Sequence, residues 1–282
     1  MQPVIHLRSA VSLLGRFPAL AGVDLDVHAG EVVLLQGPNG AGKTTLLKVC
    51  AGLVPVVSGE AVVLGQDLSV SRREVRTRVG YLPHHTGLYD DLTVADNLRF
   101  WTRAAGAAQA DADAAARRLG LDGRLQDVAV SRLSAGQRRR VSIACLIARR
   151  PELWLLDEPH AGLDNDTRDV IDDLVRSAAA SGATVLVASH ELDRTERLAS
   201  RHVTIAGGVI TSGDPGPHAD DAAVTDPVGT DPAGTEAAAT DAAGTDDGSG
   251  LERASEESGS HEPGQERTVP DTQGQKSQAH VR

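Results

Sequence analysis

The chain has 282 residues and a formal net charge of −11 at pH 7. Residues 1–212 carry 24 basic and 24 acidic side chains, whereas residues 213–282 carry 4 and 15, so the C-terminal part holds the whole excess. A neutral folded part argues against non-specific nucleic-acid binding. No apolar run approaches the ~20 residues that span a bilayer, so a membrane role would need partner subunits.

The N-terminus and the cysteines favour a reducing compartment. The first residues lack the apolar region and the cleavage site of a signal peptide. Cys50 and Cys145 each lie in apolar sequence that is typical of helices, and neither belongs to a CxxC pair. A disulfide or a metal site built on them is therefore not expected.

The N-terminal residues predict an antiparallel β part and the first strand of a parallel sheet. Apolar and polar residues alternate at 4–13 and 23–27, and residues 61–64 form an apolar run, which together favour antiparallel strands. Residues 31–35 form a continuous apolar run of strand length, and residues 42–50 have helical spacing. A buried strand that leads into a helix is therefore expected here.

The later residues predict an α/β fold with a mostly parallel core sheet. Residues 153–157 and 184–189 are two more apolar strands, and residues 167–180 between them have helical spacing. This strand–helix–strand alternation is typical of a parallel sheet that is covered on both faces. Residues from about 84 to 150, including the Ala-rich run at 104–119, carry more helix signals and predict an inserted helical lobe.

The chain is predicted to divide into a folded domain at residues 1–212 and an acidic, low-complexity tail at residues 213–282. In the tail a threonine recurs every five residues from Thr225 to Thr245. Such a segment cannot bury enough apolar surface to offset its ordering entropy, so we expect it to be disordered. A solvated extension is the simplest interpretation, and an interaction or regulatory tail is the alternative.

A glycine-rich segment follows the strand at 31–35 and opens the helix at 42–50. It matches GxxxxGK[ST], whose inward-pointing N–H groups and helix N-terminus bind nucleotide phosphates. Lys43 is expected to reach the β- and γ-phosphates, and the Thr44 hydroxyl is expected to ligate Mg²⁺. The predicted nucleotide-binding residues are Gly37, Pro38, Asn39, Gly40, Ala41, Gly42, Lys43, Thr44 and Thr45.

Two acidic residues stand at the end of the strand at 153–157. Asp157 is the last residue of this strand, and Glu158 follows it directly. Because side chains alternate in direction along a strand, the two carboxylates should point to different places. Asp157 is expected to face the metal, and Glu158 is expected to face the attacking water.

A second anion-binding helix start is predicted at Leu133-Ser134-Ala135-Gly136-Gln137. This segment precedes a helix over residues 138–149, and Ser134 with the Gly136 backbone can bind phosphate there. A monomer with one nucleotide does not need a second site of this kind. We therefore expect it to cap the nucleotide of a neighbouring copy. The arginines at 138–140 are interpreted as a solvated helix face.

Residues 1–212 closely resemble the ABC ATPase family. The segment at 133–137 is similar to the LSGGQ signature of that family, with Ala135 in place of the first glycine. Residues 153–158 resemble its Walker B strand with the catalytic glutamate, Asp164 lies in a segment similar to its D-loop, and His190 resembles its switch histidine.

The resemblance implies a P-loop ABC ATPase fold with ATP and Mg²⁺ as cofactors. It implies a head-to-tail dimer with a second copy or a related ATPase subunit, in which two ATP molecules lie between the glycine loop of one subunit and the signature of the other. Glu158, His190 and Lys43 are then the catalytic residues. His190 would contact the γ-phosphate, and Asp164 would act across the interface.

Two positions depart from the family pattern. His84 stands at the usual glutamine position, where it would join Thr44 and Asp157 near the metal, and its imidazole can gain a charge near neutral pH. We expect an ATPase that is more sensitive to pH than a glutamine homologue, and a swap without consequence is the alternative. Leu14 stands where an aromatic residue should stack on adenine, so Phe17 or apolar contact alone is expected to hold the base.

The segment from Tyr81 to Phe100 resembles the haem-exporter ATPases of cytochrome c maturation (CcmA type). The shared features are His84, Gly87-Leu88, Leu92-Thr93, Asp96-Asn97-Leu98 and Phe100. The resemblance implies an ATPase that drives haem export in cytochrome c biogenesis. The alternatives are the ATPase subunit of a drug, lipid or polysaccharide exporter and a non-transport ABC protein.

The resemblance also implies integral membrane transporter subunits as partners, docked around Tyr89 to Phe100, and a location at the cytoplasmic face of the cell membrane. No nucleic-acid partner is expected. Non-transport ABC proteins usually carry two motor domains or a long coiled coil, whereas this chain has one set of motifs and no sustained heptads. A stand-alone P-loop kinase or GTPase would lack Ser134 to Gln137 and His190.

Overall fold

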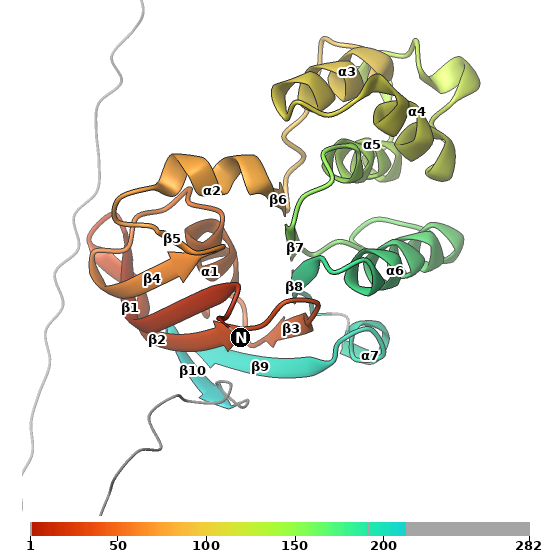
Figure 1. Cartoon of the computed structure of the whole chain (residues 1–282). Coiled ribbons are helices and arrows are strands. Elements are labelled where there is room, and N and C mark those ends of the chain that lie inside the picture. Colours follow the sequence, from red (N-terminus) through yellow and green to blue (C-terminus); the bar gives the residue numbers. More distant parts are fainter. Residues whose placement is uncertain (1, 191, 213–282) are drawn as a thin grey trace, which may run out of the picture. The chain divides into compact units, whose positions relative to one another are not determined.

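The computed structural model describes residues 2–190 and 192–212, except for the side chains of Leu192 and Asp193. The described residues form an α/β unit with two β-sheets (Figure 1), which confirms the predicted fold class. The predicted tail at 213–282 lies outside the described residues. Within the described part, no helix is long and apolar enough to cross a membrane.

The core sheet has six strands in the order β10-β9-β3-β8-β7-β6. Strands β9, β3, β8, β7 and β6 are parallel to one another, and β10 pairs antiparallel with β9 at the edge. Strands β7 and β8 are buried along their whole length, as the continuous apolar runs predict. The strands are β3 (Val32–Gln36), β6 (Val79–Leu82), β7 (Leu153–Asp157), β8 (Thr184–Ala188), β9 (Arg201–Ala206) and β10 (Val209–Ser212).

The second sheet has four antiparallel strands in the order β2-β1-β4-β5. Inward-facing residues alternate with exposed ones along β1, which is typical of a sheet with one solvated face. This sheet contacts the core sheet through the hydrogen bond from the Ala21 N–H to the Gly208 carbonyl (2.8 Å). Its strands are β1 (Ile5–Leu14), β2 (Phe17–Val27), β4 (Ser58–Val63) and β5 (Gln66–Asp67).

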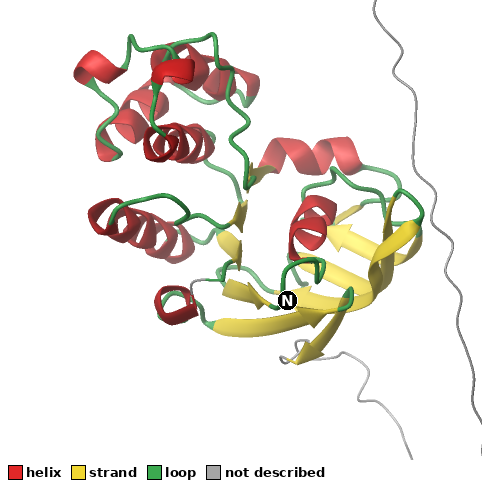
Figure 2. Ribbon diagram, turned by 180° about the vertical axis from the view of Figure 1, so that it is seen from behind, coloured by secondary structure: helices red, strands yellow, loops and turns green. Residues whose placement is uncertain are grey.

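Helices α3, α4 and α5 pack on one another and lie between β6 and β7 in the chain (Figure 2). The Ala-rich run at 104–119 does not form one helix, because the chain turns at Gly106 (φ +72°) between α3 and α4. The helices are α1 (Lys43–Cys50), α2 (Arg72–Arg78), α3 (Val94–Ala104), α4 (Gln109–Arg118), α5 (Ala135–Ala148), α6 (Asn165–Ala180) and α7 (Leu192–Thr195), with 3₁₀ turns at Gly123–Leu125 and Val130–Arg132.

Two hydrophobic cores cover the two faces of the core sheet. One core joins α1 and the antiparallel sheet to side chains of β7 such as Leu153 and Leu155. The other core joins α3 to α6 to the alternate side chains of the same strand, Trp154 and Leu156. Helices α1 and α5 therefore pack on opposite faces of the sheet, and this arrangement decides what each helix N-terminus can reach.

Candidate nucleotide-binding site

The glycine loop between β3 and α1 fits closely beneath neighbouring backbone. Gly37 has φ +139°, and a Cβ atom there would lie 2.0 Å from the Ile205 carbonyl oxygen of β9. Gly42 has φ +113°, and a Cβ atom there would lie 2.7 Å from the Ala19 carbonyl oxygen of β2. A side chain at either position would displace the loop, so these glycines are required by both backbone conformation and space.

The loop presents a cation and uncapped N–H groups on its inner side. The Lys43 side chain is 9% exposed, and its Nζ donates to the carbonyl oxygens of Gly37 (2.7 Å) and Pro38 (3.0 Å). Gly42 precedes α1, and no side chain caps the first turn of this helix. The N-terminal N–H groups and the ammonium therefore converge on one concave backbone segment, which suits a phosphate chain.

Thr44 and Asp157 meet at the end of β7, as the metal prediction requires. Thr44 Oγ1 donates to Asp157 Oδ2 at 2.9 Å, and Asp157 is 4% exposed. Within the described residues, no group of three or more His, Cys, Asp or Glu side chains could hold a metal. A hydroxyl and one carboxylate beside a phosphate loop nevertheless fit Mg²⁺, which takes few protein oxygens and completes its shell with phosphate and water.

Glu158 adopts an unusual backbone conformation next to His190. Its φ of +52° lies in the left-handed region, and its N–H donates to the Ala188 carbonyl oxygen at 2.8 Å. The Glu158 Oε2 atom lies 2.8 Å from His190 Nδ1, and the two side chains are 16% and 69% exposed. The direction of this carboxylate is therefore set by a left-handed turn after β7 as well as by strand alternation.

Arg139 is buried, so the prediction of a solvated face at 138–140 is wrong for this residue. It is 4% exposed, and its Nη2 donates to the carbonyl oxygens of Asp157 and Glu158, both at 2.6 Å. Its Nη1 donates to the Pro83 carbonyl oxygen at 2.5 Å. Burial lowers the pKa of Arg139 to about 10, so the side chain stays charged at neutral pH.

The position of Arg139 could have been recognised from helical spacing. It lies on the same face of α5 as Ile143 and Leu146, both of which are buried. In the sequence alone, Arg139 stands between two other arginines, so the three residues are interpreted together as one charged, solvated face. Arg139 ties α5 to the chain after β6 and to the chain after β7, including the backbone of Glu158.

His84 lies beside the site without contacting the metal residues. His84 is exposed, and its ring packs edge-on against the ring of His85 with 5.1 Å between the centroids. In the described part of the chain, no hydrogen bond joins the His84 ring to Thr44 or Asp157. The Arg139 Nη1 reaches the His84 carbonyl oxygen at 3.4 Å. A direct role of the His84 ring at the metal therefore stays a prediction.

The pH dependence expected for His84 can be measured directly. His84→Gln should flatten the pH–rate profile of ATP hydrolysis between pH 6 and 8, because glutamine cannot gain a proton there. His85→Gln is the matched control, since His85 is also exposed and contacts the same ring. An unchanged profile in His84→Gln would show that the substitution of the family glutamine has no consequence.

The signature segment forms a capped and exposed helix start. The Gln137 N–H donates to Ser134 Oγ at 3.2 Å, and the Ser134 N–H donates to Gln137 Oε1 at 2.9 Å. This reciprocal capping box starts α5 at Ala135, three residues earlier than predicted. Ser134 and Ala135 are exposed, and Leu133 is buried beneath them.

The D-loop lies against the signature of the same chain. A Cβ atom on Gly136 would lie 3.1 Å from the Gly162 carbonyl oxygen. Asp164 caps α6 by accepting a hydrogen bond from the Thr167 N–H at 2.8 Å, and this bond lowers the pKa of Asp164. Its action across a subunit interface stays a prediction.

Phe17 lies at the start of β2 and is 79% exposed. It pairs in register with Leu14, which is 54% exposed, at the tip of the β1–β2 hairpin. Two residues further along β2, the Ala19 carbonyl lies against Gly42 of the glycine loop. Strand β2 therefore runs from this exposed apolar tip to the glycine loop, and a contact of Phe17 with the base stays a prediction.

Comparisons with known proteins agree with this geometry. A sequence profile of the ABC transporter family matches residues 20–161. The chain is 34% identical over 219 residues to the Nod factor export ATP-binding protein I of Cupriavidus metallidurans, covering 76% of this chain and 72% of that protein. It is 34% identical over 231 residues to the probable multidrug ABC transporter ATP-binding protein YbhF of Escherichia coli, covering 76% of this chain and 38% of that protein.

The fold also matches a solved structure. A dimeric ATP-binding cassette in a post-hydrolysis state, bound to ADP and Pi, superposes with a TM-score of 0.69 at 25% identity. The match covers 74% of this chain and 97% of that chain. Nearly the whole of a separate ATP-binding cassette is therefore represented in the described residues.

Proposed function

Because this chain belongs to the ABC transporter family, we propose that it is the ATP-hydrolysing subunit of an exporter and works as a head-to-tail dimer. Cassettes of this family are ATPases coupled to transport. One observation carries the dimer in particular: the two anion-binding helix starts belong to opposite faces of the core sheet.

The two helix starts would have to meet on one nucleotide. Helix α1 follows the glycine loop on one face, and α5 follows Ser134 on the other face (Figures 1 and 2). Helix α1 packs with the antiparallel sheet and α5 packs with α3 and α4, so we infer that Lys43 and Ser134 of one chain do not enclose the same phosphate chain. A second copy in a head-to-tail arrangement would bring its Ser134 to the nucleotide held by the first.

Separate described residues are then assigned to phosphate binding, to metal binding and to activation of the attacking water. Lys43 and the N–H groups of the glycine loop bind the phosphates, and Thr44 with Asp157 would hold Mg²⁺, whose positive charge would offset that of the phosphates. Glu158 orients the attacking water and accepts its proton. His190 keeps the Glu158 carboxylate in place and reaches toward the γ-phosphate. Phosphoryl transfer depends on such positioning more than on covalent chemistry, so closure of the dimer should control the rate.

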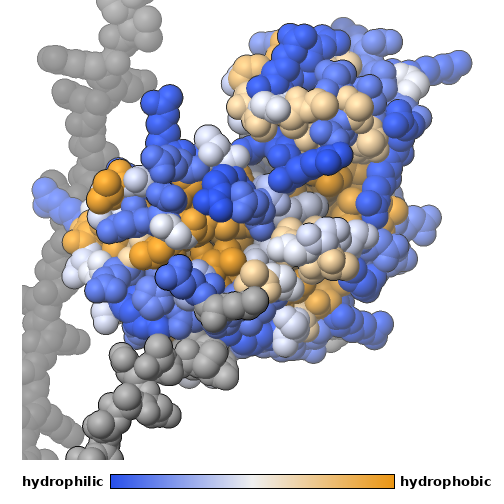
Figure 3. Space-filling model, in the orientation of Figure 1, coloured by the Kyte–Doolittle hydropathy of each residue, from blue (hydrophilic) through white to orange (hydrophobic). Residues whose placement is uncertain are grey.

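A groove beside α5 offers a docking place for a membrane subunit. It has a volume of about 330 Å³ and lies between α2 and the helices α3 and α5, where Leu53, Tyr81, Leu88, Trp101 and Leu146 line it. Figure 3 shows apolar residues in the hollow between the part that carries α2 and the helices above it. An apolar cytoplasmic segment of a membrane subunit is the occupant that the family membership supports.

Exposed aromatic side chains extend this groove. The Tyr89 and Phe100 side chains are 47% and 43% exposed, and the Phe100 ring lies 5.3 Å from the ring of Trp101. Exposed clustered aromatics are typical of protein interfaces. They lie within the segment at 89–100 that the sequence predicts to dock membrane subunits, and docking there would couple dimer closure to movement at the membrane.

A charge placed on this surface tests the docking proposal. Phe100→Glu should abolish co-purification with the membrane subunits while the ATPase activity of the isolated chain stays within twofold of wild type. Val70→Glu is the matched control, because Val70 is 82% exposed and lies outside the groove. Retained co-purification in Phe100→Glu, or an equal loss in Val70→Glu, would contradict the proposal.

The comparisons support export as the direction of transport, and they do not support haem as the transported molecule. The matched relatives are named for Nod factor export and multidrug transport, and they do not support haem export in cytochrome c biogenesis. The haem-exporter expectation rests on sequence resemblance alone, chiefly that of the segment from Tyr81 to Phe100. We therefore propose an exporter ATPase at the cytoplasmic face of the membrane. Stimulation of ATP hydrolysis in the reconstituted complex by a Nod factor or a drug, but not by haem, would support this assignment, whereas stimulation by haem alone would reverse it.

A further inference from the structure

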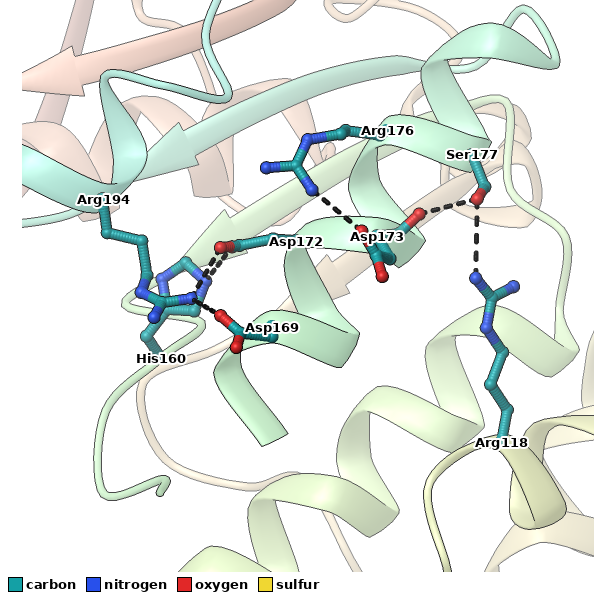
Figure 4. A network of polar contacts seen from close by, with 8 residues as sticks. All are labelled: Arg118, His160, Asp169, Asp172, Asp173, Arg176, Ser177 and Arg194. Atoms are coloured by element: carbon teal, nitrogen blue, oxygen red, sulfur yellow. Dashed lines mark hydrogen bonds and ion pairs between the residues drawn. The ribbon is translucent and has the colours of Figure 1, made fainter. Parts of the chain in front are cut away.

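Four side chains from the loop after β7 and from helices α6 and α7 form a partly buried polar network (Figure 4). Asp172 Oδ1 lies 2.8 Å from His160 Nε2, and Asp172 Oδ2 lies 2.7 Å from Arg194 Nη1. The same Arg194 nitrogen lies 2.7 Å from Asp169 Oδ1. We call His160, Asp169, Asp172 and Arg194 the α6–α7 brace.

Burial makes the centre of this brace costly unless its partners are held in place. His160 is 2% exposed and Asp172 is 5% exposed. Each carboxylate oxygen of Asp172 has a partner from a different segment: His160 comes from the loop after β7, and Arg194 comes from α7. A buried carboxylate is strongly destabilised when one of its partners is removed, so these three segments are bound to one another.

The brace joins the same two segments that carry the proposed catalytic pair. His160 lies two residues after Glu158, and Arg194 lies four residues after His190. Glu158 and His190 contact each other at 2.8 Å, but the His190 side chain is 69% exposed. An exposed ion pair is weak by itself, whereas the buried bonds of Asp172 are less screened by solvent. The brace is therefore the firmer of the two connections.

The backbone of Glu158 needs such support. Its φ of +52° is disfavoured for a residue with a side chain, and conformations of this kind persist where the surroundings hold them. On one side, the Glu158 carbonyl accepts from Arg139. On the other side, the next fixed side chain along the loop is His160, which Asp172 holds.

We propose that the α6–α7 brace is a positioning device that holds the loop after Glu158 against the helix after His190. This inference rests on the proposed function, because it takes Glu158 and His190 as the pair that orients the attacking water. Loosening the brace slows hydrolysis and leaves ATP binding intact, because the glycine loop that binds the phosphates lies outside the brace.

A matched pair on the same helix allows a sharp test. Asp173 and Arg176 form an ion pair at 2.9 Å one residue further along α6, with both side chains more than half exposed (Figure 4). The test variants are Asp172→Asn and Arg194→Gln, and the controls are Asp173→Asn and Arg176→Gln. Steady-state kinetics give kcat and KM, equilibrium titration gives the Kd for ATP, and thermal unfolding reports the folded fraction.

The brace variants should lose about tenfold to a hundredfold in kcat, since small displacements of catalytic groups cost rates of this size. Their KM and Kd for ATP should stay within twofold of wild type, and both control variants should keep wild-type kcat. Arg194 is partly exposed, so Arg194→Gln keeps the test decisive if Asp172→Asn does not fold. A folded Arg194→Gln protein with wild-type kcat, or a parallel loss of kcat and ATP affinity, would overturn the inference.

Substitutions at His160 add a readout that a purely structural role would not move. His160→Gln keeps an N–H donor that can reach Asp172, whereas His160→Leu removes it. Turnover retained in the Gln variant and lost in the Leu variant supports the brace, and equal turnover in both contradicts it. Glu158→Gln separates this result from the proposed function: if that variant loses turnover while brace variants do not, the brace alone is wrong. Unchanged turnover in Glu158→Gln would reject the proposed function itself.

Discussion

Glu158→Gln is expected to lower the rate of ATP hydrolysis by about 10²–10⁴-fold, the usual contribution of a positioned general base. Glutamine has nearly the same shape and can still accept the hydrogen bond from the His190 N–H, but it cannot take a proton from water. ATP binding should survive because the glycine loop is untouched. The variant should therefore accumulate as an ATP-bound dimer, which gel filtration with and without ATP and Mg²⁺ can detect.

Glu152→Gln is the matched control for this prediction. Glu152 directly precedes β7, whereas Glu158 directly follows it, and the Glu152 side chain is 54% exposed in an ion pair with Arg78. Its loss should change turnover by less than twofold. A Glu158→Gln protein that hydrolyses ATP as a monomer at the wild-type rate would contradict both the base and the dimer.

Arg139→Met is expected to lower the free energy of unfolding by about 2–4 kcal/mol, because it removes a buried charged donor from several backbone carbonyl oxygens. Those oxygens belong to Pro83, Asp157 and Glu158. The lost hydrogen bonds therefore include one to the backbone of Glu158, which carries the proposed catalytic carboxylate. Turnover should also fall by about tenfold or more, since the Glu158 carbonyl loses its hydrogen bond from Arg139 and the loop can shift. Urea unfolding and steady-state kinetics measure the two effects.

Arg138→Met controls for the loss of an arginine from the same helix. Arg138 is only partly buried and donates to the carbonyl oxygens of Val130 and Ser131. We expect it to change stability by less than about 1 kcal/mol. If Arg139→Met were no more destabilised than Arg138→Met, the hydrogen bonds from Arg139 to the backbone of Asp157 and Glu158 would not contribute to the stability of the fold.

Local patterns predicted the strands and helices whose periodicity is clear within one window. Strands β3, β7 and β8 and helices α1 and α6 appear within a few residues of their expected bounds. Residues 72–78 form α2 without a recognisable apolar face, because only Val75 is buried on it. Alanine favours a helix throughout residues 104–119, and this pattern did not reveal that Gly106 divides the run.

The motif residues could be predicted because each motif is contiguous and makes local contacts. Gly37 and Gly42 have the backbone conformations that only glycine adopts easily, and Ser134 caps the helix that follows it. Arg139 and Asp172 act through partners that are distant in the sequence. Their roles depend on how β6, β7 and α7 are brought together, and no window of the sequence contains that information.

In the proposed dimer, ATP is held between the glycine loop of one copy and the signature of another. The most direct test is a short thiol-to-thiol crosslinker applied to Asn39→Cys, Ala135→Cys in a Glu158→Gln background. Both positions are exposed, whereas burial raises the pKa of the native Cys50 and Cys145 thiols to about 12 and keeps them unreactive. We expect a covalent dimer only when ATP and Mg²⁺ are present and only when both new cysteines are there. An ATP-loaded protein that gives no covalent dimer, or one that crosslinks equally without nucleotide, would contradict this arrangement of the two copies.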